Sequence, residues 1–287
     1  MDFCHIAPTP HLDLVKDRRA CLTLAHLIDE NFDKDNYDAS YTDWYKNNPH
    51  EINIMDNSGF ELYKTGQMMY PGDQLVDLAG KVNATHIVIP DHPDHPSMVG
   101  IDEARRYAPI FKEAGFGTFF VPQSTIGDLE DLLTSFAFAA SNPYIDYIGV
   151  SILAVPNAYK CESGNKLQRF LSRWKFMNEI KARGLLSLAK SNGKKIHFLG
   201  MVDGPNEIAL MRDFPIDTWD SSASVWAGLN GISFDESPTG LFEGKFEKHV
   251  DFNAKIDDPI KVELAKDNIN YIDELSEAIN EVPIQRR

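Results

Sequence analysis

Short apolar runs alternate along this chain with longer segments in which apolar residues recur every three or four positions. The short runs predict buried strands, and the longer segments predict amphipathic helices. Strands are expected at 52–55, 86–90, 118–122, 146–155, 195–201, 215–219 and 231–234. Helices are expected at 73–81, 101–114, 127–140, 165–191, 205–212, 222–229 and 259–280, with loops over 237–258.

This alternation is typical of a parallel sheet that is covered by helices. Seven strands in regular succession within 287 residues favour a (β/α)8 TIM barrel, and an open α/β sheet stays the alternative. We therefore expect an α/β fold with a single barrel domain over 51–287. Residues 1–50 are expected to form an N-terminal extension packed on the barrel.

Composition narrows the class of protein. No segment approaches the roughly twenty consecutive apolar residues of a membrane-spanning helix, and the start MDFCHIAPTP lacks the pattern of a signal peptide. Cys4, Cys21 and Cys161 are scattered, with no CxxC pair, which argues against a disulfide framework or a cysteine zinc site. We expect a cytoplasmic protein that makes no membrane contact and needs no metal or other cofactor.

The charge is unevenly distributed. The whole chain carries −15, yet residues 160–195 hold ten Lys or Arg against Glu162 and Glu179, a local excess of +8. A basic stretch on an acidic protein is a candidate footprint for nucleic-acid phosphates. A solvated helix face explains the same spacing, so both interpretations stay open.

Catalytic groups of a barrel stand at the carboxyl ends of its strands. There the sequence places Asp56, Asp91, Gln123, the Leu153-Ala154 segment, Gly200, and Asp217 with Asp220. Carboxylates and a carboxamide accept N–H groups from a planar base better than they hold a phosphate, and no glycine-rich phosphate loop occurs. In HIVIPDHPDHPS, the prolines keep His92 and His95 off one helical face, so we expect loop surface rather than a metal site.

Six short motifs then occur in one order between residues 52 and 231. They are IMDNSGFEL (54–62), HIVIPDHPDHPS (86–97), FFVPQST (119–125), DYIGVSILAV (146–155), HFLGMVDGPNEI (197–208) and IDTWDSSASVWAGLNG (216–231). Each resembles a segment of the tRNA-guanine transglycosylase (queuine tRNA-ribosyltransferase) superfamily. The first is similar to that family's DSGGYQ segment, and the last resembles the VDMFDCV…RNG stretch that carries its nucleophile.

The resemblance implies a (β/α)8 barrel that exchanges bases at a ribosyl carbon. Asp220 would be the nucleophile that forms a covalent glycosyl-enzyme, and Asp56 would be the general acid–base. By the same resemblance, Asp91 and Gln123 would recognise the purine edge, and Phe60 would stack on the ring. Four further residues would complete the pocket: Leu153, Ala154, Leu199 and Gly200.

Departures from the tRNA enzymes indicate which branch the chain resembles most. It lacks the CxC…CxxC…H ligand set of their zinc subdomain, and VWAGL (225–229) stands where they place arginines after the nucleophile. The chain is most similar to the bacteriophage transglycosylases that place 7-deazaguanines into DNA. The resemblance thus implies exchange of guanine in DNA for preQ0 or a derivative, in the host cytoplasm if a phage encodes the chain. Arg169, Arg173 and Lys175 are the expected phosphate contacts.

Several alternatives stay open. The chain could be a tRNA-guanine transglycosylase that lacks the zinc subdomain, or a DNA N-glycosylase or glycosidase-type hydrolase that uses the same carboxylates without an incoming base. It could also be a binding protein with a decayed site. Asp217 competes with Asp220 for the role of nucleophile, and the oligomeric state is open, a homodimer included.

Overall fold

The computed structural model describes residues 1–34, 37–162, 164–202, 204–237 and 250–281. In these ranges eight parallel strands form one sheet, in the order β1-β8-β7-β6-β5-β4-β3-β2. The outermost strands β1 and β2 also lie in contact, so the sheet is a nearly closed (β/α)8 barrel, as expected. The strands are β1 (Asp2–His5), β2 (Ala20–Leu24), β3 (Ile52–Asp56), β4 (His86–Val88), β5 (Gly117–Phe120), β6 (Tyr147–Ser151), β7 (Lys195–Leu199) and β8 (Thr218–Ser221).

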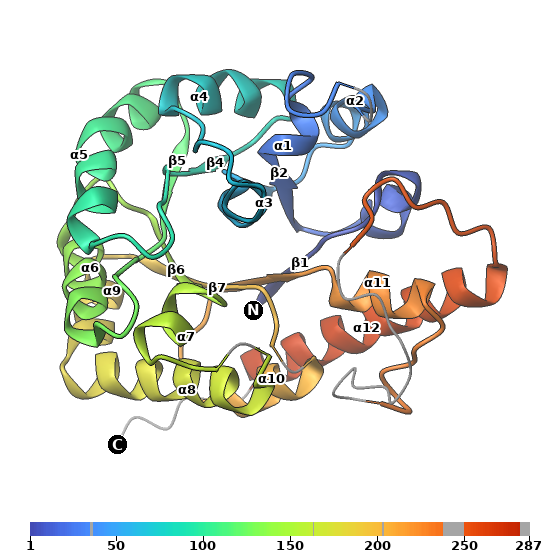
Figure 1. Cartoon of the computed structure of the whole chain (residues 1–287). Coiled ribbons are helices and arrows are strands. Elements are labelled where there is room, and N and C mark those ends of the chain that lie inside the picture. The colour runs from blue at the N-terminus through green and yellow to red at the C-terminus, as the bar shows by residue number, and fades with distance from the viewer. Residues whose placement is uncertain (35–36, 163, 203, 238–249, 282–287) are drawn as a thin grey trace.

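Helices surround the barrel, and the short helices α3, α7 and α10 lie over the carboxyl ends of the strands (Figure 1). No helix in the described ranges is both long and apolar enough to cross a membrane. The helical segments are η1 (Thr9–Val15), α1 (Ala25–Ile28), α2 (Ala39–Asn47), α3 (Gly59–Thr65), α4 (Gly72–Lys81), α5 (Ser97–Glu113), α6 (Leu129–Ser141), α7 (Ala154–Ala158), α8 (Lys166–Ala182), α9 (Leu185–Ser191), α10 (Pro205–Leu210), α11 (Ala223–Leu229) and α12 (Pro259–Glu281).

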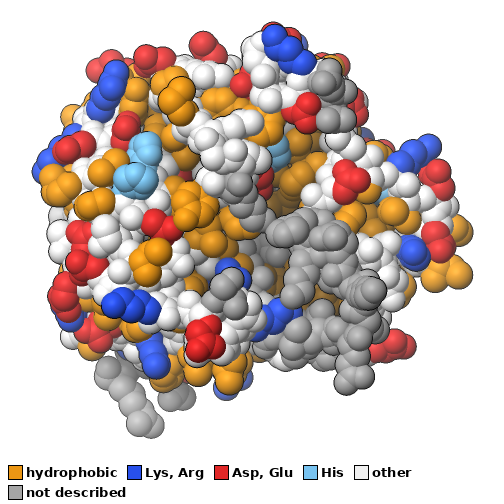
Figure 2. Space-filling view, viewed as in Figure 1, with side chains coloured by type: hydrophobic (Ala, Val, Ile, Leu, Met, Phe, Trp, Pro, Cys, Tyr) orange, Lys and Arg blue, Asp and Glu red, His pale blue; other side chains and the backbone are white. Residues whose placement is uncertain are grey.

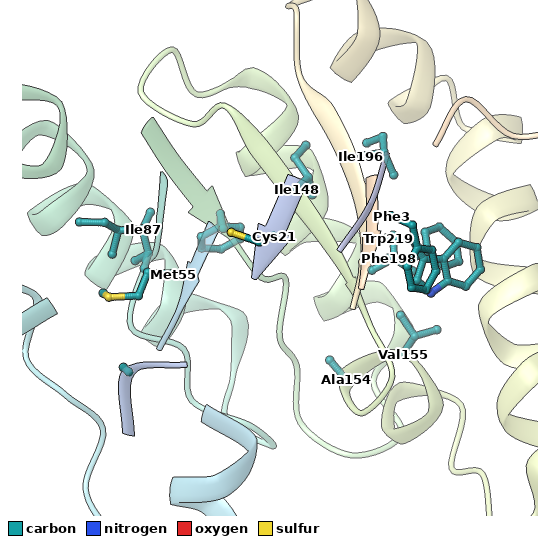
Figure 3. Close-up of a cluster of buried hydrophobic side chains, with 14 of the residues drawn as sticks. Phe3, Cys21, Met55, Ile87, Ile148, Ala154, Val155, Ile196, Phe198 and Trp219 are labelled. Atoms are coloured by element: carbon teal, nitrogen blue, oxygen red, sulfur yellow. The ribbon is translucent and has the colours of Figure 1, made fainter. Parts of the chain in front are cut away.

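Two apolar layers follow from the period of two along each strand. Residues such as Cys4, Ile54 and Phe119 fill the barrel interior. Strand residues that face the other way, such as Phe198 and Trp219, pack instead between the sheet and the helices (Figure 3). The strands are buried on both faces, which is why the sequence shows continuous apolar runs rather than alternation.

The N-terminal segment differs from its expected role as an extension. Residues 1–50 supply β1 and β2, so they build the barrel rather than pack on it, and residue 50 is no boundary of the barrel. Both strands are short, four and five residues, and β1 is followed closely by Pro8. Their apolar runs are therefore too brief to stand out by pattern alone, and pairing with β8 and β3 decides them.

Two other expected elements are corrected. Residues 231–234 were expected to be a strand but form an irregular turn after α11, where Gly231 adopts a φ of 82° and Ile232 N–H donates to Ala227 O. Their apolar side chains are buried without forming a strand, and Phe234 N–H donates to Asn268 on α12. The single helix expected over 165–191 is two helices, because Gly184 has a φ of 74° and separates α8 from α9. The loop expected over 237–258 lies outside the described residues at 238–249, and 250–258 is irregular as expected.

Candidate active site

The periodicity of β3 and β8 turns two carboxylates into the mouth of the barrel. Asp56 follows the parity of Ile52 and Ile54, which face the interior, and it pairs with the inward-facing Leu24 of β2. Asp220 pairs with Cys4, which also faces the interior. Both residues stand near the carboxyl ends of their strands, so the two predicted catalytic carboxylates lie at the same end of the barrel.

The loop after β3 holds Asp56 in a strained turn. Ser58 has a φ of 59°, which is rare for a residue with a side chain, and its N–H donates to Asp56 Oδ2 at 2.8 Å. The Ser58 hydroxyl oxygen in turn accepts a bond from the backbone N–H of His26 at 3.0 Å and lies 2.8 Å from His26 Nδ1. Helix α1, which directly follows β2, thus holds the turn that follows Asp56.

The environment of Asp56 favours its protonated form. Burial raises the pKa of its carboxyl well above the ordinary value, and the charges of Glu61, Asp91 and Asp220 raise that pKa further. The hydrogen bond from Ser58 opposes the rise without reversing it. A carboxyl whose raised pKa favours retention of its proton has the property that a general acid needs.

Asp91, just beyond β4, is held by two amides. Asn57 Nδ2 donates to Asp91 Oδ1 at 2.8 Å, and Gln123 Nε2 donates to Asp91 Oδ2 at 2.6 Å. Burial raises the pKa of Asp91, while the two amide hydrogen bonds oppose the rise. Gly59 permits this arrangement, because a Cβ there would lie 2.5 Å from Asp91 Oδ1. The residues predicted to read a base, Asp91 and Gln123, are therefore in direct contact.

The carbonyl oxygen of Gln123 has no partner among the described residues, although the side chain is only 3% exposed. A buried amide oxygen without a donor costs free energy, and a bound group that brings an N–H would recover it. Next to it, Asp91 offers further acceptor capacity. The pair is thus suited to the N–H-rich edge of a heterocyclic base.

Asp220 accepts two hydrogen bonds on a single oxygen. His197 Nε2 lies 2.9 Å from Asp220 Oδ1, and the N–H of Gly200 lies 3.2 Å from the same oxygen. Asp217, its competitor for the role of nucleophile, precedes β8 at the other end of the strand. There it pairs with Lys190 at 2.6 Å and Lys195 at 3.6 Å. The position of Asp220 at the mouth favours it over Asp217 as the reactive carboxylate.

The backbone residues predicted to complete the pocket lie at the same mouth, but many of their polar groups are already bonded. The N–H groups of Leu153 and Ala154 both donate to the Ser151 hydroxyl, at 3.0 and 3.2 Å. Leu199 O accepts from Ile152 N, and the oxygen of Gly200 accepts from Trp219 Nε1 at 2.8 Å. These residues therefore shape the pocket more than they offer hydrogen bonds to a ligand.

Arg173 is not the phosphate contact that the sequence predicted. It is 0% exposed and pairs at 3.0 Å with Glu207, which is also 0% exposed. Its guanidinium donates to Gly200 O at 3.0 Å and to Val150 O at 3.1 Å. The side chain enters from α8 and joins the ends of β6 and β7, so its charge is used inside the protein to hold the loop beneath the candidate site.

Other cations of the stretch 160–195 are also engaged by the protein itself. Arg183 pairs with Glu130 and Glu179, Lys190 pairs with Asp217, and Lys194 donates to backbone oxygens. Arg169 is partly buried and donates to Ile152 O at 3.0 Å, while Lys175 is exposed on α8. The local excess of +8 therefore overstates the positive charge that this surface presents to a nucleic acid.

The Pro-rich loop after β4 ties neighbouring loops together. Asp94, with a φ of 65°, accepts from Asn157 Nδ2 of α7 and from the Tyr63 hydroxyl of α3, both at 2.6 Å. His95 Nδ1 lies 2.9 Å from Pro93 O, and His92 lies 3.5 Å from Glu103. No group of three or more His, Cys, Asp or Glu in the described part of the chain is arranged to hold a metal ion.

A groove of about 410 Å³ opens beside the site. Met69 links the two, because a Cβ on Gly59 would lie 3.3 Å from Met69 Cε and also meet Asp91. Phe60, the predicted stacking residue, is 39% exposed at the start of α3. The same face is hollowed near its centre, with hydrophobic side chains visible around the hollow (Figure 2). Residues of the loops after β2 and β3 line the groove: Asp29, Asn31, Phe32, Leu62, Gln67, Met68, Met69, Tyr70, Pro71 and Gln74.

Sequence reasoning missed three residues that organise the site. Asn57 directly follows Asp56 and bonds Asp91, His197 lies inside the barrel against Asp220, and Glu207 holds Arg173. A polar residue within an apolar strand was a usable signal for His197, since a buried imidazole needs partners. Nothing in the spacing of Asn57 or Glu207 pointed to their contacts, which join residues 34 apart in the chain.

No family model matches the chain, and no curated protein matches it.

Proposed function

We propose that this protein is a base-exchanging transglycosylase that replaces guanine in DNA with a 7-deazaguanine base, preQ0 or a derivative, through a glycosyl intermediate on Asp220. The observation that carries the proposal is the convergence at one barrel mouth of two strand-end carboxyl groups and a hydrogen-bonded carboxylate–carboxamide pair. These are Asp220, Asp56, and Asp91 with Gln123. The resemblance of the six sequence motifs to the transglycosylases indicates the reaction in which these residues would act.

Each group has a step that its environment suits. Asp220 attacks C1′ of the target nucleotide, and Asp56 gives its proton to the departing guanine. The incoming base then attacks C1′, loses a proton to Asp56 and displaces Asp220. Asp91 and Gln123 hold the N–H groups of either base, and Phe60 stacks on the ring. No step requires a metal or an organic cofactor.

The choice of DNA rests on the sequence, which has no zinc subdomain set and no arginines after Asp220. The corresponding residues Val225 and Trp226 are buried in α11 and present no charge. The target guanine must leave the duplex stack at a cost of a few kcal/mol, and the groove beside Gly59 offers room for a neighbouring nucleotide. With few exposed cations on α8, we expect DNA binding to be weak and sensitive to salt.

The test is guanine release from duplex DNA that carries radiolabelled guanine, with preQ0 in excess. We expect release that requires preQ0 and that is lost in Asp220→Asn but kept in Asp217→Asn, the matched control just before the same strand. The same assay with tRNA and an assay for abasic sites run in parallel. Release from tRNA alone would assign the chain to the tRNA enzymes, and abasic sites without preQ0 would assign it to the glycosylases. Silence in all assays would refute the proposal.

A further inference from the structure

His197 occupies an unusual place for an imidazole, the interior of the barrel. Its strand neighbours Ile196 and Phe198 face the helices, so the period of two turns His197 inward, where it is 0% exposed. The ring of Phe119 packs edge-on against it at a centroid distance of 5.0 Å. A polar ring in this layer has a cost unless both nitrogens are bonded.

Both nitrogens of His197 are bonded, and the bonds define a chain. Nε2 lies 2.9 Å from Asp220 Oδ1, and Nδ1 lies 2.7 Å from Thr218 Oγ1. Because a carboxylate only accepts, Nε2 must carry a proton, and the Nδ1 of a neutral ring then accepts from the Thr218 hydroxyl. The hydroxyl thus selects the tautomer that donates to Asp220.

The two oxygens of Asp220 are consequently unequal. Oδ1 receives His197 and the N–H of Gly200, whereas no donor among the described residues contacts Oδ2. The first oxygen is held by these two donors. The second keeps its lone pairs for an electrophile at the barrel mouth.

We propose that His197 is a positioning residue that anchors Asp220 Oδ1 so that Oδ2 is the attacking oxygen. This inference rests on the function proposed above. A lone pair of Oδ2 forms the bond to C1′, the electrons of the C1′–N9 bond leave with guanine, and the Asp56 carboxyl supplies the proton. In the second step N9 of the incoming base bonds C1′, its proton returns to Asp56, and the C1′–O electrons return to Oδ2.

The donors on Oδ1 act mainly in this second step. When Oδ2 becomes an ester oxygen, Oδ1 loses its charge, so the hydrogen bonds to it stabilise the free carboxylate more than the ester. They therefore make Asp220 a better leaving group when the new base attacks. Loss of His197 should slow the return step and let the covalent glycosyl-enzyme accumulate.

The experiment compares His197→Leu with His197→Gln, whose amide nitrogen can reach the position of Nε2. We expect His197→Leu to lower turnover per active site by about 10- to 100-fold, the range for one hydrogen bond to a charged group. The ratio kcat/KM for duplex DNA reports the first step and should not fall, whereas KM should fall together with turnover, and the fraction of protein trapped as a DNA adduct on denaturing gels should rise. His197→Gln should restore most of the turnover.

Active-site titration separates positioning from folding. If His197→Leu lowers only the concentration of active sites, with an unchanged rate for each, the role is structural and the inference is wrong. The inference also fails if kcat/KM for duplex DNA falls as much as turnover, or if His197→Gln is no better than His197→Leu. The ¹⁵N shifts of the His197 ring in the wild-type protein give a second measurement that needs no turnover. The Nε2–H tautomer is expected, and the Nδ1–H tautomer would overturn the inference.

These readouts distinguish the two proposals. Wild-type protein that releases no guanine from any nucleic acid refutes the proposed function, and the positioning role falls with it. Guanine release by the wild type together with full activity of His197→Leu refutes the positioning role alone.

Discussion

Arg173 offers the sharpest test of the difference between the structure and the sequence-based prediction. Removal of a buried cation lowers the stability of the protein, whereas removal of a surface phosphate contact changes the salt dependence of DNA binding. Arg173→Met keeps much of the volume of the side chain and removes the charge. It leaves the carboxylate of Glu207 buried without its guanidinium and deprives Gly200 O and Val150 O of a donor. The stacking of Arg173 on Phe198, at 4.5 Å from the ring centroid, is lost as well.

The magnitude follows from burial and geometry. Both partners are 0% exposed and 3.0 Å apart, and removal of one member of such a pair costs about 3–5 kcal/mol in the free energy of unfolding. For a chain of this length, about 2 °C of melting temperature corresponds to 1 kcal/mol, so Tm should fall by roughly 6–10 °C. Glu207→Gln combined with Arg173→Met should recover part of this loss, since no buried charge is then left unpaired.

Urea and thermal unfolding measure the effect, and Lys175→Met is the matched control. Lys175 lies two residues away on the same helix and is exposed, so its replacement should change the free energy of unfolding by less than about 0.5 kcal/mol. The salt dependence of DNA binding should be unchanged by Arg173→Met beyond the loss of folded protein. If Arg173→Met leaves the free energy of unfolding unaltered and reduces the salt dependence of DNA binding, the buried pair is refuted and Arg173 is a phosphate contact after all.

Three further predictions concern the mouth of the barrel. Asp56→Asn should abolish guanine release yet gain unfolding free energy over the wild type as pH rises above about 4. A raised native pKa means that ionisation of Asp56 increasingly disfavours the folded wild type; parallel pH profiles of the two proteins would contradict this. Burial lowers the pKa of His26 from 6.5 to about 4. The free energy of unfolding should therefore fall by up to about 3 kcal/mol as the pH is lowered from 6.5 to 4, because the unfolded chain binds the proton first. His26→Gln should flatten that slope in urea titrations. Gly59→Ala should displace the carboxylate of Asp91, cost about 1–3 kcal/mol in the free energy of unfolding and impair exchange, while Gly80→Ala, whose Cβ would meet no atom within 4 Å, should not; equal activities would show that the close approach has no function.

The positions of the candidate carboxylates could be anticipated because they depend on local order along the chain. A strand that ends in Asp56, Asp91 or Asp220 presents that residue at the carboxyl edge of a parallel sheet wherever the strand pairs. The contact between Asp91 and Gln123 was expected only as a shared location. Which atoms meet depends on the paths of two loops and on Asn57 between them, and these paths are set by tertiary packing.

The basic stretch shows where pattern reasoning failed. A count of charges along the sequence treats each Lys or Arg as exposed, but several of them form ion pairs with carboxylates that are distant in the chain. Arg173 and Glu207 are 34 residues apart, and neither carries a local mark of burial. Their contact exists because α8 and the loop after β7 meet at the ends of β6 and β7.

Hydrophobic periodicity and strand order are local properties, so the amino-acid pattern was enough to predict the barrel class, most of its strands and helices, and the carboxylates at its mouth. The pattern could not predict that residues 1–50 close the barrel, that Arg173 lies inside the protein or that His197 contacts Asp220. The physical reason is that burial and hydrogen-bond partners arise from segments far apart in the chain. Their proximity is fixed only when the sheet closes and its two apolar layers pack.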